Sequence, residues 1–185
     1  MKILKPYKNF SLANVTQGYN NLHHAIDSIP FRKEGLGGYG TPLVAPEKVT
    51  IGKVYTINTP REDDDNALMK NGFGLWMKGE SGYEHLYWHT QPILPVKTGD
   101  VVERGTIVAY VGNSGNVYSG GEYVPVEERN IPNFRGTHLH QQVVLSGQLL
   151  NPLDFIDMET EPSYTIFDEL KAMAITLGKI SGLLK

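Results

Sequence analysis

The histidines are the most informative residues of this sequence, because all of them fall into three tight groups. The six positions are His23, His24, His85, His89, His138 and His140. Asp27 follows the first group and adds a carboxylate. Imidazole nitrogens and carboxylate oxygens are good zinc ligands, and a catalytic zinc site uses three of them with water in the fourth position. The alternative is a set of ordinary polar residues on the surface of a sheet.

The spacing within two of the groups indicates which side chains share a face. Side chains alternate along a strand, so His138 and His140 point to one face while Leu139 points to the core. The same rule places His85 and His89 on one face of their own strand. Each group therefore offers a pair of histidines that one site can use.

The first group is judged by the distance of each histidine from the carboxylate. His23 and Asp27 are four residues apart, so they share a side in a strand and also in a helix. His24 shares the side of Asp27 only in a helix. The spacing therefore favours His23 as the partner of Asp27. If three residues bind a metal, two of the remaining histidines can serve in proton transfer or in stabilising a transition state.

The composition limits the kind of site and the kind of partner. No cysteine is present, which excludes disulfides and thiolate zinc sites. The formal net charge is −3 and no basic stripe runs along the chain, which argues against nucleic-acid binding. No apolar run approaches the length that spans a bilayer. The first residues lack the apolar stretch of a signal peptide.

Short strands between glycines and prolines must position these side chains. Segments 73–78 and 83–90 flank a turn-like stretch and predict a β-hairpin. Further strands are expected over 49–57, 101–102, 106–111 and 139–145. Strands of this length, separated by turn signals, predict an all-β domain of mainly antiparallel sheet.

Two segments depart from this pattern. Residues 61–66 are acidic, and we interpret them as a solvated loop because the spacing of a calcium loop is missing. From Ile166 to Leu184 apolar residues recur at three- and four-residue intervals, which predicts an amphipathic C-terminal helix. We expect it to pack on the β domain or on a second copy of the chain, giving a homo-oligomer. The predicted division is a β domain over 1–157, which carries all three histidine groups, and a helical tail over 158–185.

The ordered motifs resemble the lysostaphin/LytM-type zinc metalloendopeptidases of peptidoglycan. The motifs that carry the resemblance are His23-x-x-x-Asp27, Tyr87-x-His89 and His138-x-His140. Intervening segments are also similar, namely residues 15–19, 40–45, 96–105, 112–115 and 151–153. Any one tripeptide is a weak match, but the ordered set covers about residues 13–156 and is specific.

The resemblance implies a fold, a cofactor and a reaction. The fold is a compact antiparallel β-sheet domain of the lysostaphin type, a duplicated hybrid motif with a groove across it. One Zn²⁺ per chain is held by His23, Asp27 and His140, and the catalytic residues His89 and His138 flank the attacking water. One of these two acts as general acid and base and the other stabilises the oxyanion, and the sequence leaves open which does which. The implied activity is zinc-dependent hydrolysis of peptide bonds in a stem peptide or crosslink of bacterial peptidoglycan.

Two histidines and one insertion have no counterpart in the family pattern. We interpret His24 and His85 as bystanders, with His85 the better candidate for lining the groove. Residues 116–136 stand where the family passes directly to its last histidine pair. We expect this insertion to form a wall or lid of the groove. The rings of Tyr118, Tyr123 and Phe134 can cover aliphatic parts of a peptide, and Arg129 and Arg135 can pair with substrate carboxylates. The alternative is a surface excursion without a role.

Other functions on related folds remain as alternatives. The main one is a non-catalytic wall-binding or activator scaffold, although all five key positions are filled here. A lipoyl-like carrier is less favoured, because no lysine sits in a tight hairpin of the required kind. The expected place of action is the cell wall, extracellular or periplasmic. Since a signal peptide is missing, we expect a phage-encoded endolysin or a processed form.

Overall fold

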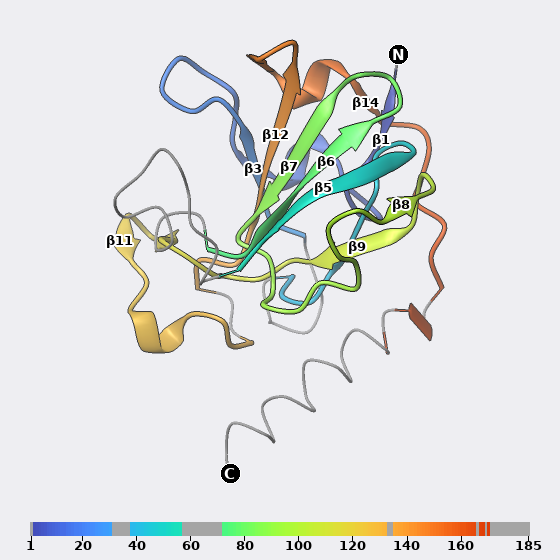
Figure 1. Cartoon of the computed structure of the whole chain (residues 1–185). Coiled ribbons are helices and arrows are strands. Elements are labelled where there is room, and N and C mark those ends of the chain that lie inside the picture. The colour runs from blue at the N-terminus through green and yellow to red at the C-terminus, as the bar shows by residue number, and fades with distance from the viewer. Residues whose placement is uncertain are drawn as a thin grey trace.

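A large antiparallel sheet of eight strands forms the centre of the molecule (Figure 1). The computed structural model describes residues 2–30, 38–56, 72–132, 135–165, 167, 168 and 170. Across the sheet the strands follow the order β2 (Val15–Gln17), β3 (Ile26–Ser28), β12 (Leu139–Leu145), β7 (Glu84–Trp88), β6 (Gly74–Gly79), β5 (Val49–Tyr55) and β8 (Val101–Val102). The eighth strand, β13 (Gln148–Leu150), pairs with the end of β12. The site described below therefore lies on neighbouring strands that are far apart in the sequence.

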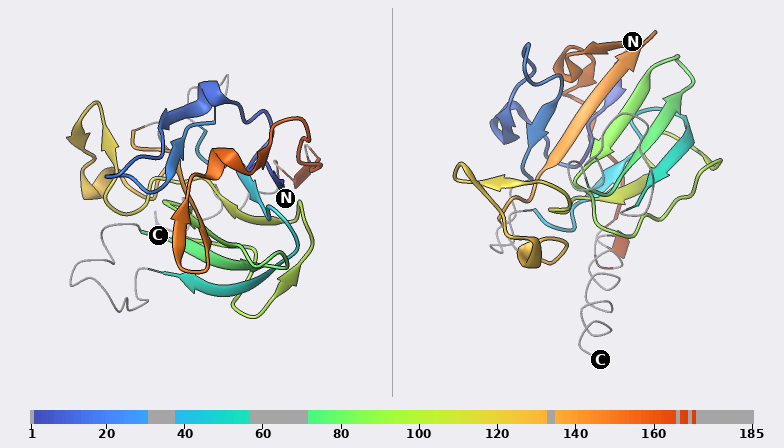
Figure 2. Two further views of the ribbon diagram at one scale, coloured as in Figure 1. Left: turned by 90° about the horizontal axis from the view of Figure 1, so that it is seen from above. Right: turned by 60° about the vertical axis from the view of Figure 1, so that its left-hand side comes forward.

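Three smaller strand pairs complete the fold. Strand β4 (Pro42–Val44) pairs antiparallel with β9 (Ile107–Tyr110), and β1 (Ile3–Leu4) pairs parallel with β14 (Ile156–Asp157). The short hairpin of β10 (Tyr118–Ser119) and β11 (Glu122–Tyr123) stands to one side of the large sheet (Figures 1 and 2). Three 3₁₀ turns are η1 (Leu12–Asn14), η2 (Val126–Glu128) and η3 (Pro152–Asp154).

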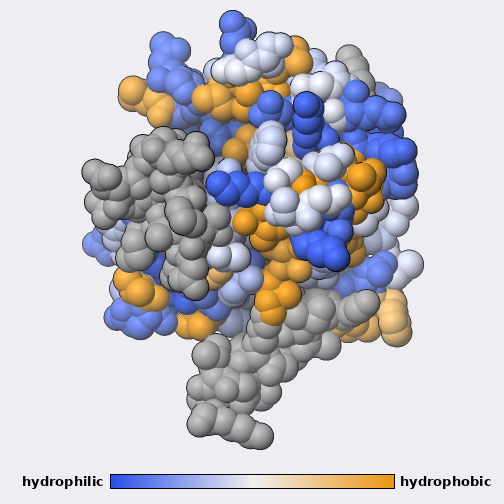
Figure 3. Space-filling view, in the orientation of Figure 1, coloured by the Kyte–Doolittle hydropathy of each residue, from blue (hydrophilic) through white to orange (hydrophobic). Residues whose placement is uncertain are grey.

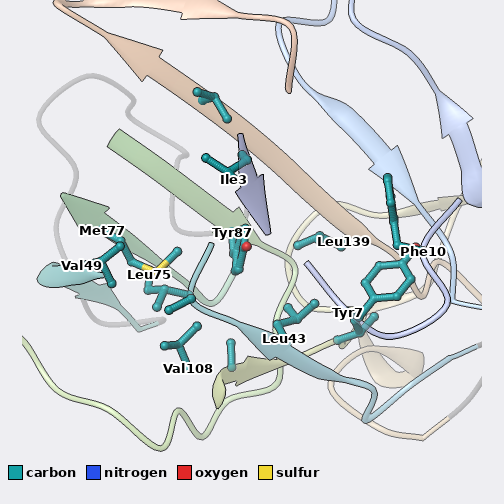
Figure 4. Close-up of a cluster of buried hydrophobic side chains, with 14 of the residues drawn as sticks. Ile3, Tyr7, Phe10, Leu43, Val49, Leu75, Met77, Tyr87, Val108 and Leu139 are labelled. Atoms are coloured by element: carbon teal, nitrogen blue, oxygen red, sulfur yellow. The ribbon is translucent and has the colours of Figure 1, made fainter. Parts of the chain in front are cut away.

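The core lies between the large sheet and the β4–β9 pair (Figure 4). Leu75 and Met77 of β6 are fully buried, as are Leu43 of β4 and Val108 of β9. The hydroxyl of Tyr87 on β7 donates a hydrogen bond of 3.0 Å to the carbonyl of Val44, which joins the two sheets. This buried layer supports one end of the strands that carry the histidines.

The predicted antiparallel all-β domain is confirmed. The hairpin of β6 and β7 and the strand β12 have the bounds that the sequence indicated, to within a few residues. Residues 167, 168 and 170 are the α-helical ones among those described, and the described part of the chain holds no helix long and apolar enough to cross a membrane. The acidic run 61–66 lies outside the described residues. The C-terminal helix expected from Ile166 to Leu184 also lies outside them, apart from residues 167, 168 and 170. The homo-oligomer expected through this helix stays a prediction.

Residues 159–164 fold back against the first strand. Glu161 pairs with Lys5, and Tyr164 packs on Leu4 and Val44. The division at residue 157 stays a prediction.

The face of the molecule shown in Figure 3 mixes hydrophilic and hydrophobic residues without one dominant patch of either kind.

Candidate metal centre

The pairing of β3 with β12 brings a carboxylate and an imidazole together. Asp27 lies directly opposite His140 in the antiparallel register. Residues directly opposite each other on antiparallel strands project to the same face, so both side chains leave the sheet together. Leu139, next to His140, is fully buried in the core, as the alternation along the strand predicted.

A tight turn before β3 supplies the second imidazole. The backbone N–H of His23 donates to Oδ1 of Asn20 at 3.0 Å, which closes the turn. The Nδ1 atom of His23 lies 3.2 Å from the carbonyl of Gly18, and since a carbonyl only accepts, Nδ1 carries the proton. This leaves Nε2 as the free ligand atom. A hydrogen bond from the other ring nitrogen is the usual way in which a metal-binding histidine is oriented.

The three side chains present donor atoms close enough together to surround a zinc ion. Nε2 of His23 lies 3.3 Å from both Nδ1 of His140 and Oδ1 of Asp27, and these last two atoms are 2.8 Å apart. Ligands about 2.0–2.2 Å from a tetrahedral Zn²⁺ are separated by about 3.3–3.6 Å, so the two longer distances fit. The 2.8 Å contact is a hydrogen bond between His140 and Asp27, which would have to lengthen around a metal. His23, Asp27 and His140 are a group of three residues that could hold a metal ion. Their set of two nitrogens and one oxygen leaves the fourth position open, as a catalytic zinc site requires.

Asp27 is held in its charged form, which a metal ligand needs. Burial alone would raise the pKa of this carboxyl, but the hydrogen bond from His140 and the nearby imidazoles of His138, His140 and His23 lower it overall. A carboxylate that stays ionised at neutral pH contributes one negative charge to the centre.

Two further histidines flank this centre, and each is held in a single tautomer. Nδ1 of His89 lies 2.7 Å from the carbonyl of Ser114, and Nδ1 of His138 lies 2.9 Å from the carbonyl of Gly136. Each Nδ1 must therefore carry its proton, and each Nε2 is left with a free lone pair. The ring centroids of His89 and His138 are 4.5 Å apart. Sequence reasoning identified both histidines but not the carbonyls that orient them, since a backbone acceptor leaves no mark on residue type.

The backbone at His89 corrects one expectation. Strand β7 ends at Trp88, and His89 follows it with a φ of 59°, in the left-handed region. The alternation rule, which placed His85 and His89 on one face, is therefore wrong across this boundary. His85 faces the interior, whereas the turn redirects His89 toward the metal ligands.

Both flanking imidazoles are held neutral. Burial lowers the pKa of His89 well below its usual range, and the neighbouring His138 and His140 lower it further. Burial also lowers the pKa of His138, although Asp27 opposes the shift. A neutral imidazole with a free Nε2 can accept a proton, which is the property of a general base.

The five residues line one pocket of about 560 Å³. A volume of this size is typical of small-molecule and peptide sites. Thr16 and Gln17 of β2 form one side. The opposite side is formed by the insertion, through Asn116, Tyr118 and Tyr123. The expectation that residues 116–136 form a wall of the groove agrees with this geometry.

The remaining histidines lie outside the pocket. His24 is exposed and packs against the ring of Tyr19, with centroids 5.7 Å apart. His85 is fully buried, and its Nε2 lies 2.8 Å from Oε1 of Glu47. The idea that His85 lines the groove is wrong, because β7 turns it toward the interior. Glu47 was not singled out from the sequence, since an isolated glutamate carries no motif.

Comparison with known proteins agrees with this geometry. The sequence matches peptidase family M23 over residues 37–152. An uncharacterized metalloprotease of Haemophilus influenzae is 28% identical over 116 residues, which are 62% of this chain and 18% of that protein. This chain therefore spans less than a fifth of the length of that relative. The family match begins after His23 and Asp27, so their assignment as ligands depends on the measured distances.

Solved structures share the fold at low sequence identity. A zinc-containing peptidase from Vibrio cholerae superposes with a TM-score of 0.55 and 18% identity, over 82% of this chain and 40% of that one. LytU superposes with a TM-score of 0.53 and 23% identity, over 82% and 89% of the two chains. The solution structure of lysostaphin gives 0.51 and 19%, over 82% and 56%. The resemblance to the lysostaphin-type fold is confirmed.

Proposed function

We propose that this chain is a zinc-dependent endopeptidase that cuts peptide bonds in bacterial cell-wall peptidoglycan. The chain belongs to peptidase family M23 and is a metallopeptidase. The observation that carries the proposal is the convergence of three donor atoms, from His23, Asp27 and His140, beside two neutral histidines in one pocket. The donor set fits Zn²⁺, with one ion per chain, and leaves a position for water or substrate.

Zinc bound there would polarise a scissile carbonyl and lower the pKa of a water molecule toward neutrality. The chain itself supplies the proton transfers. A free Nε2, on His89 or on His138, accepts the proton of the attacking water. Once protonated, the same nitrogen becomes a donor that can pass the proton to the leaving amine. For the other imidazole to stabilise the developing oxyanion, its Nε2 must also carry a proton, because only an N–H can donate to that oxygen.

The hydrogen bonds at Nδ1 explain why these two imidazoles suit this role. The carbonyls of Ser114 and Gly136 hold the rings of His89 and His138, so neither ring needs to reorient before it takes a proton. A base oriented in advance avoids the cost of reorganisation during the reaction. Either histidine can serve as the base, and we leave the two roles unassigned.

The place of action follows from the substrate. We propose that the protein works at the cell wall, and that the β domain over residues 1–157 holds the complete zinc site. The scaffold alternative gains no support from the site, because the five side chains are all present and converge. A phage origin stays a prediction.

The test is digestion of purified sacculi from several wall types, followed by mass spectrometry of the released peptides. The protein should release fragments with new peptide termini, lose this activity on treatment with a zinc chelator, and regain it when Zn²⁺ is restored. Release that persists without metal, or zinc-loaded protein that cuts no wall peptide, would contradict the proposal.

A further inference from the structure

The hairpin of the insertion is the part of the pocket wall that the metal chemistry does not use. Tyr118 of β10 and Tyr123 of β11 are paired directly across the hairpin, with ring centroids 4.1 Å apart. Both residues line the pocket, and each is 53% exposed. Two large rings are thus presented to solvent beside the metal ligands, without being covered by the protein.

This wall is fixed to the loop that orients a catalytic histidine. Asn113 is fully buried, and its Nδ2 donates to the carbonyl of Glu128 at 3.1 Å while its Oδ1 accepts from the backbone N–H of Asn130 at 2.8 Å. The next residue, Ser114, provides the carbonyl for His89. The insertion and the catalytic imidazole are therefore held by adjacent residues, which sets their relative position.

A small apolar base supports the hairpin. Val117 and Val124, which flank the two strands, are fully buried, and the N–H of Val124 donates to the carbonyl of Val117 at 3.0 Å. Gly136 packs so closely that a Cβ there would lie 2.6 Å from Val117. Val117, Val124 and Gly136 are packed as tightly as residues in a protein core. The two tyrosine rings above them are therefore not exposed because of loose packing in the hairpin.

The charged side chains of the insertion are engaged within it. Both carboxylate oxygens of Glu128 accept from Arg135, at 2.9 and 2.8 Å. Arg129 donates to the carbonyl of Val124 at 2.8 Å and to Asn116 at 3.1 Å. Neither arginine lines the pocket, and part of their donors hold the fold of the insertion, so the expected pairing with substrate carboxylates gains no support here and stays a prediction.

The rest of the pocket lining is neutral. Apart from the metal ligands and the two flanking histidines, the described residues that line it include no Lys, Arg, Asp or Glu. Thr16, Gln17, Asn116, Ser119 and Thr137 supply hydroxyl and amide groups. Such groups can hydrogen-bond a peptide backbone but cannot compensate the desolvation of a charged side chain.

We propose that Tyr118 and Tyr123 form a binding platform for an uncharged segment of the substrate peptide next to the cut bond, and so determine specificity. The platform contacts apolar faces of small residues through the rings, and the neutral polar lining takes the backbone of the same segment. This inference depends on the proposed endopeptidase activity. It adds the expectation that peptides with Asp, Glu, Lys or Arg beside the scissile bond are cut less efficiently.

A purely structural role for the tyrosine pair makes a different prediction. Cross-strand aromatic pairs stabilise short hairpins, and that alone would account for the contact between the rings. Threonine favours strand conformation but has no ring. Tyr118→Thr and Tyr123→Thr should therefore preserve the hairpin while removing one half of the platform each. Val126→Ala is the matched control, since Val126 belongs to the insertion, is 61% exposed and does not line the pocket.

The experiment measures kcat and KM on a fluorescence-quenched peptide that the zinc-loaded parent protein cuts, and on versions with Ala beside the cut bond changed to Asp or Lys. Each Tyr→Thr variant should raise KM roughly five- to tenfold with little change in kcat, at unchanged zinc content. Val126→Ala should match the parent. The parent should cut the Asp and Lys peptides at least about tenfold less efficiently than the neutral one.

The outcomes separate this inference from the proposed function. If the parent cuts no peptide, the proposed function fails. If the parent cuts the neutral peptide but both Tyr→Thr variants keep its KM within twofold, the tyrosines only stabilise the hairpin and the inference is overturned. Equal cutting of the neutral and charged peptides would overturn the selection for an uncharged segment. Should a Tyr→Thr variant fail to fold, Tyr118→Leu, which keeps apolar bulk without a ring face, gives the same comparison.

Discussion

The two ends of strand β7 lie beside two histidine–carboxylate clusters that differ in their access to a ligand. At the start of β7, His85 and Glu47 form what we call the sealed pair. Just beyond the end of β7, His89 joins what we call the open cluster, which consists of His23, Asp27, His89, His138 and His140. Both clusters combine imidazole with a carboxylate, but only the open cluster lines the pocket.

The carboxylate of the sealed pair is surrounded by donors from the protein. Glu47 is only 3% exposed, and its carboxylate accepts from His85, from the backbone N–H of Ser81 at 3.0 Å and from the hydroxyl of Ser81 at 2.7 Å. Gly79 packs against it so tightly that a Cβ would lie 2.2 Å from Oε1. The carboxylate has no face open to a ligand.

The open cluster has fewer donors and more access. The side chain of Asp27 is 15% exposed and accepts a hydrogen bond from His140, whereas the Nδ1 protons of His23 and His138 are directed away from it, toward backbone carbonyls. The Nε2 lone pairs of His23 and His138 are therefore left on the side of the carboxylate, which is unfavourable without a cation nearby. The comparison teaches that the direction of the donors, and not the presence of His and Asp, distinguishes a metal site from a structural pair.

The largest effect should come from removing a ligand of the open cluster. His140→Ala or Asp27→Ala should lose most of the bound zinc and reduce wall-degrading activity by roughly a thousandfold or more, because two donors rarely retain a catalytic zinc. Elemental analysis of purified variants measures this directly. His24→Ala is the matched control, and a loss of zinc there with retention in His23→Ala would contradict the ligand assignment.

The flanking histidines should affect catalysis without affecting the metal. We expect His138→Ala and His89→Asn to keep zinc and lose activity by roughly 10²–10⁴-fold, the range of general acid–base catalysis. Asparagine is chosen at position 89 because it tolerates the positive φ found there. Turnover close to that of the parent in both variants, measured on sacculi at saturating zinc, would remove both residues from the mechanism.

Breaking the sealed pair should affect stability and spare chemistry. His85→Ala leaves the buried carboxylate of Glu47 without one of its donors, which costs about 1–3 kcal/mol of unfolding free energy. Denaturant unfolding measures this loss, and zinc content and activity per folded molecule should not change. A variant that unfolds like the parent but loses zinc would show that the two clusters are not independent.

The smallest effect concerns the pH dependence of stability. Burial alone would raise the pKa of Glu47, but hydrogen bonds from His85 and Ser81 hold it below its usual value. A carboxyl with a lowered folded pKa stabilises the fold above its unfolded pKa, and this contribution disappears as the pH falls through the folded value. Glu47→Gln removes the titration.

The stability advantage of the parent over Glu47→Gln should therefore shrink as the pH falls below about 4.3, the ordinary glutamate value. Urea unfolding of both proteins across this range, in chelator so that zinc loss does not contribute, gives the comparison. A difference that stays constant with pH would mean that Glu47 is not the titrating group.

The strands and the faces of their side chains could be predicted because alternation is a local property. His138, Leu139 and His140 lie within or beside one regular strand, so their spacing gave their faces correctly. The structure also places His23, and not His24, beside Asp27, although His23 lies in a turn and not in a continuous strand. Because His23 and Asp27 are four residues apart, they were expected to share a side both in a strand and in a helix. The choice of His140 as the second histidine ligand came from the family resemblance and not from the spacing.

The errors occurred where the chain leaves regular structure or where a partner is distant in sequence. The left-handed turn at His89 broke the alternation from His85, and no residue type nearby signalled it. Glu47 meets His85 across 38 residues of sequence. Such pairings are set by tertiary packing, which neither periodicity nor a short motif contains.

The central claim is that one zinc ion sits among His23, Asp27 and His140. The most direct test is a crystal structure of the zinc-loaded protein with anomalous diffraction collected on both sides of the zinc absorption edge. We predict one anomalous peak per chain, about 2.0–2.2 Å from Nε2 of His23, an Asp27 oxygen and Nδ1 of His140, with a light atom in the fourth position. A peak bound instead through His89 or His138, or no peak within reach of these three side chains at full zinc occupancy, would contradict the account.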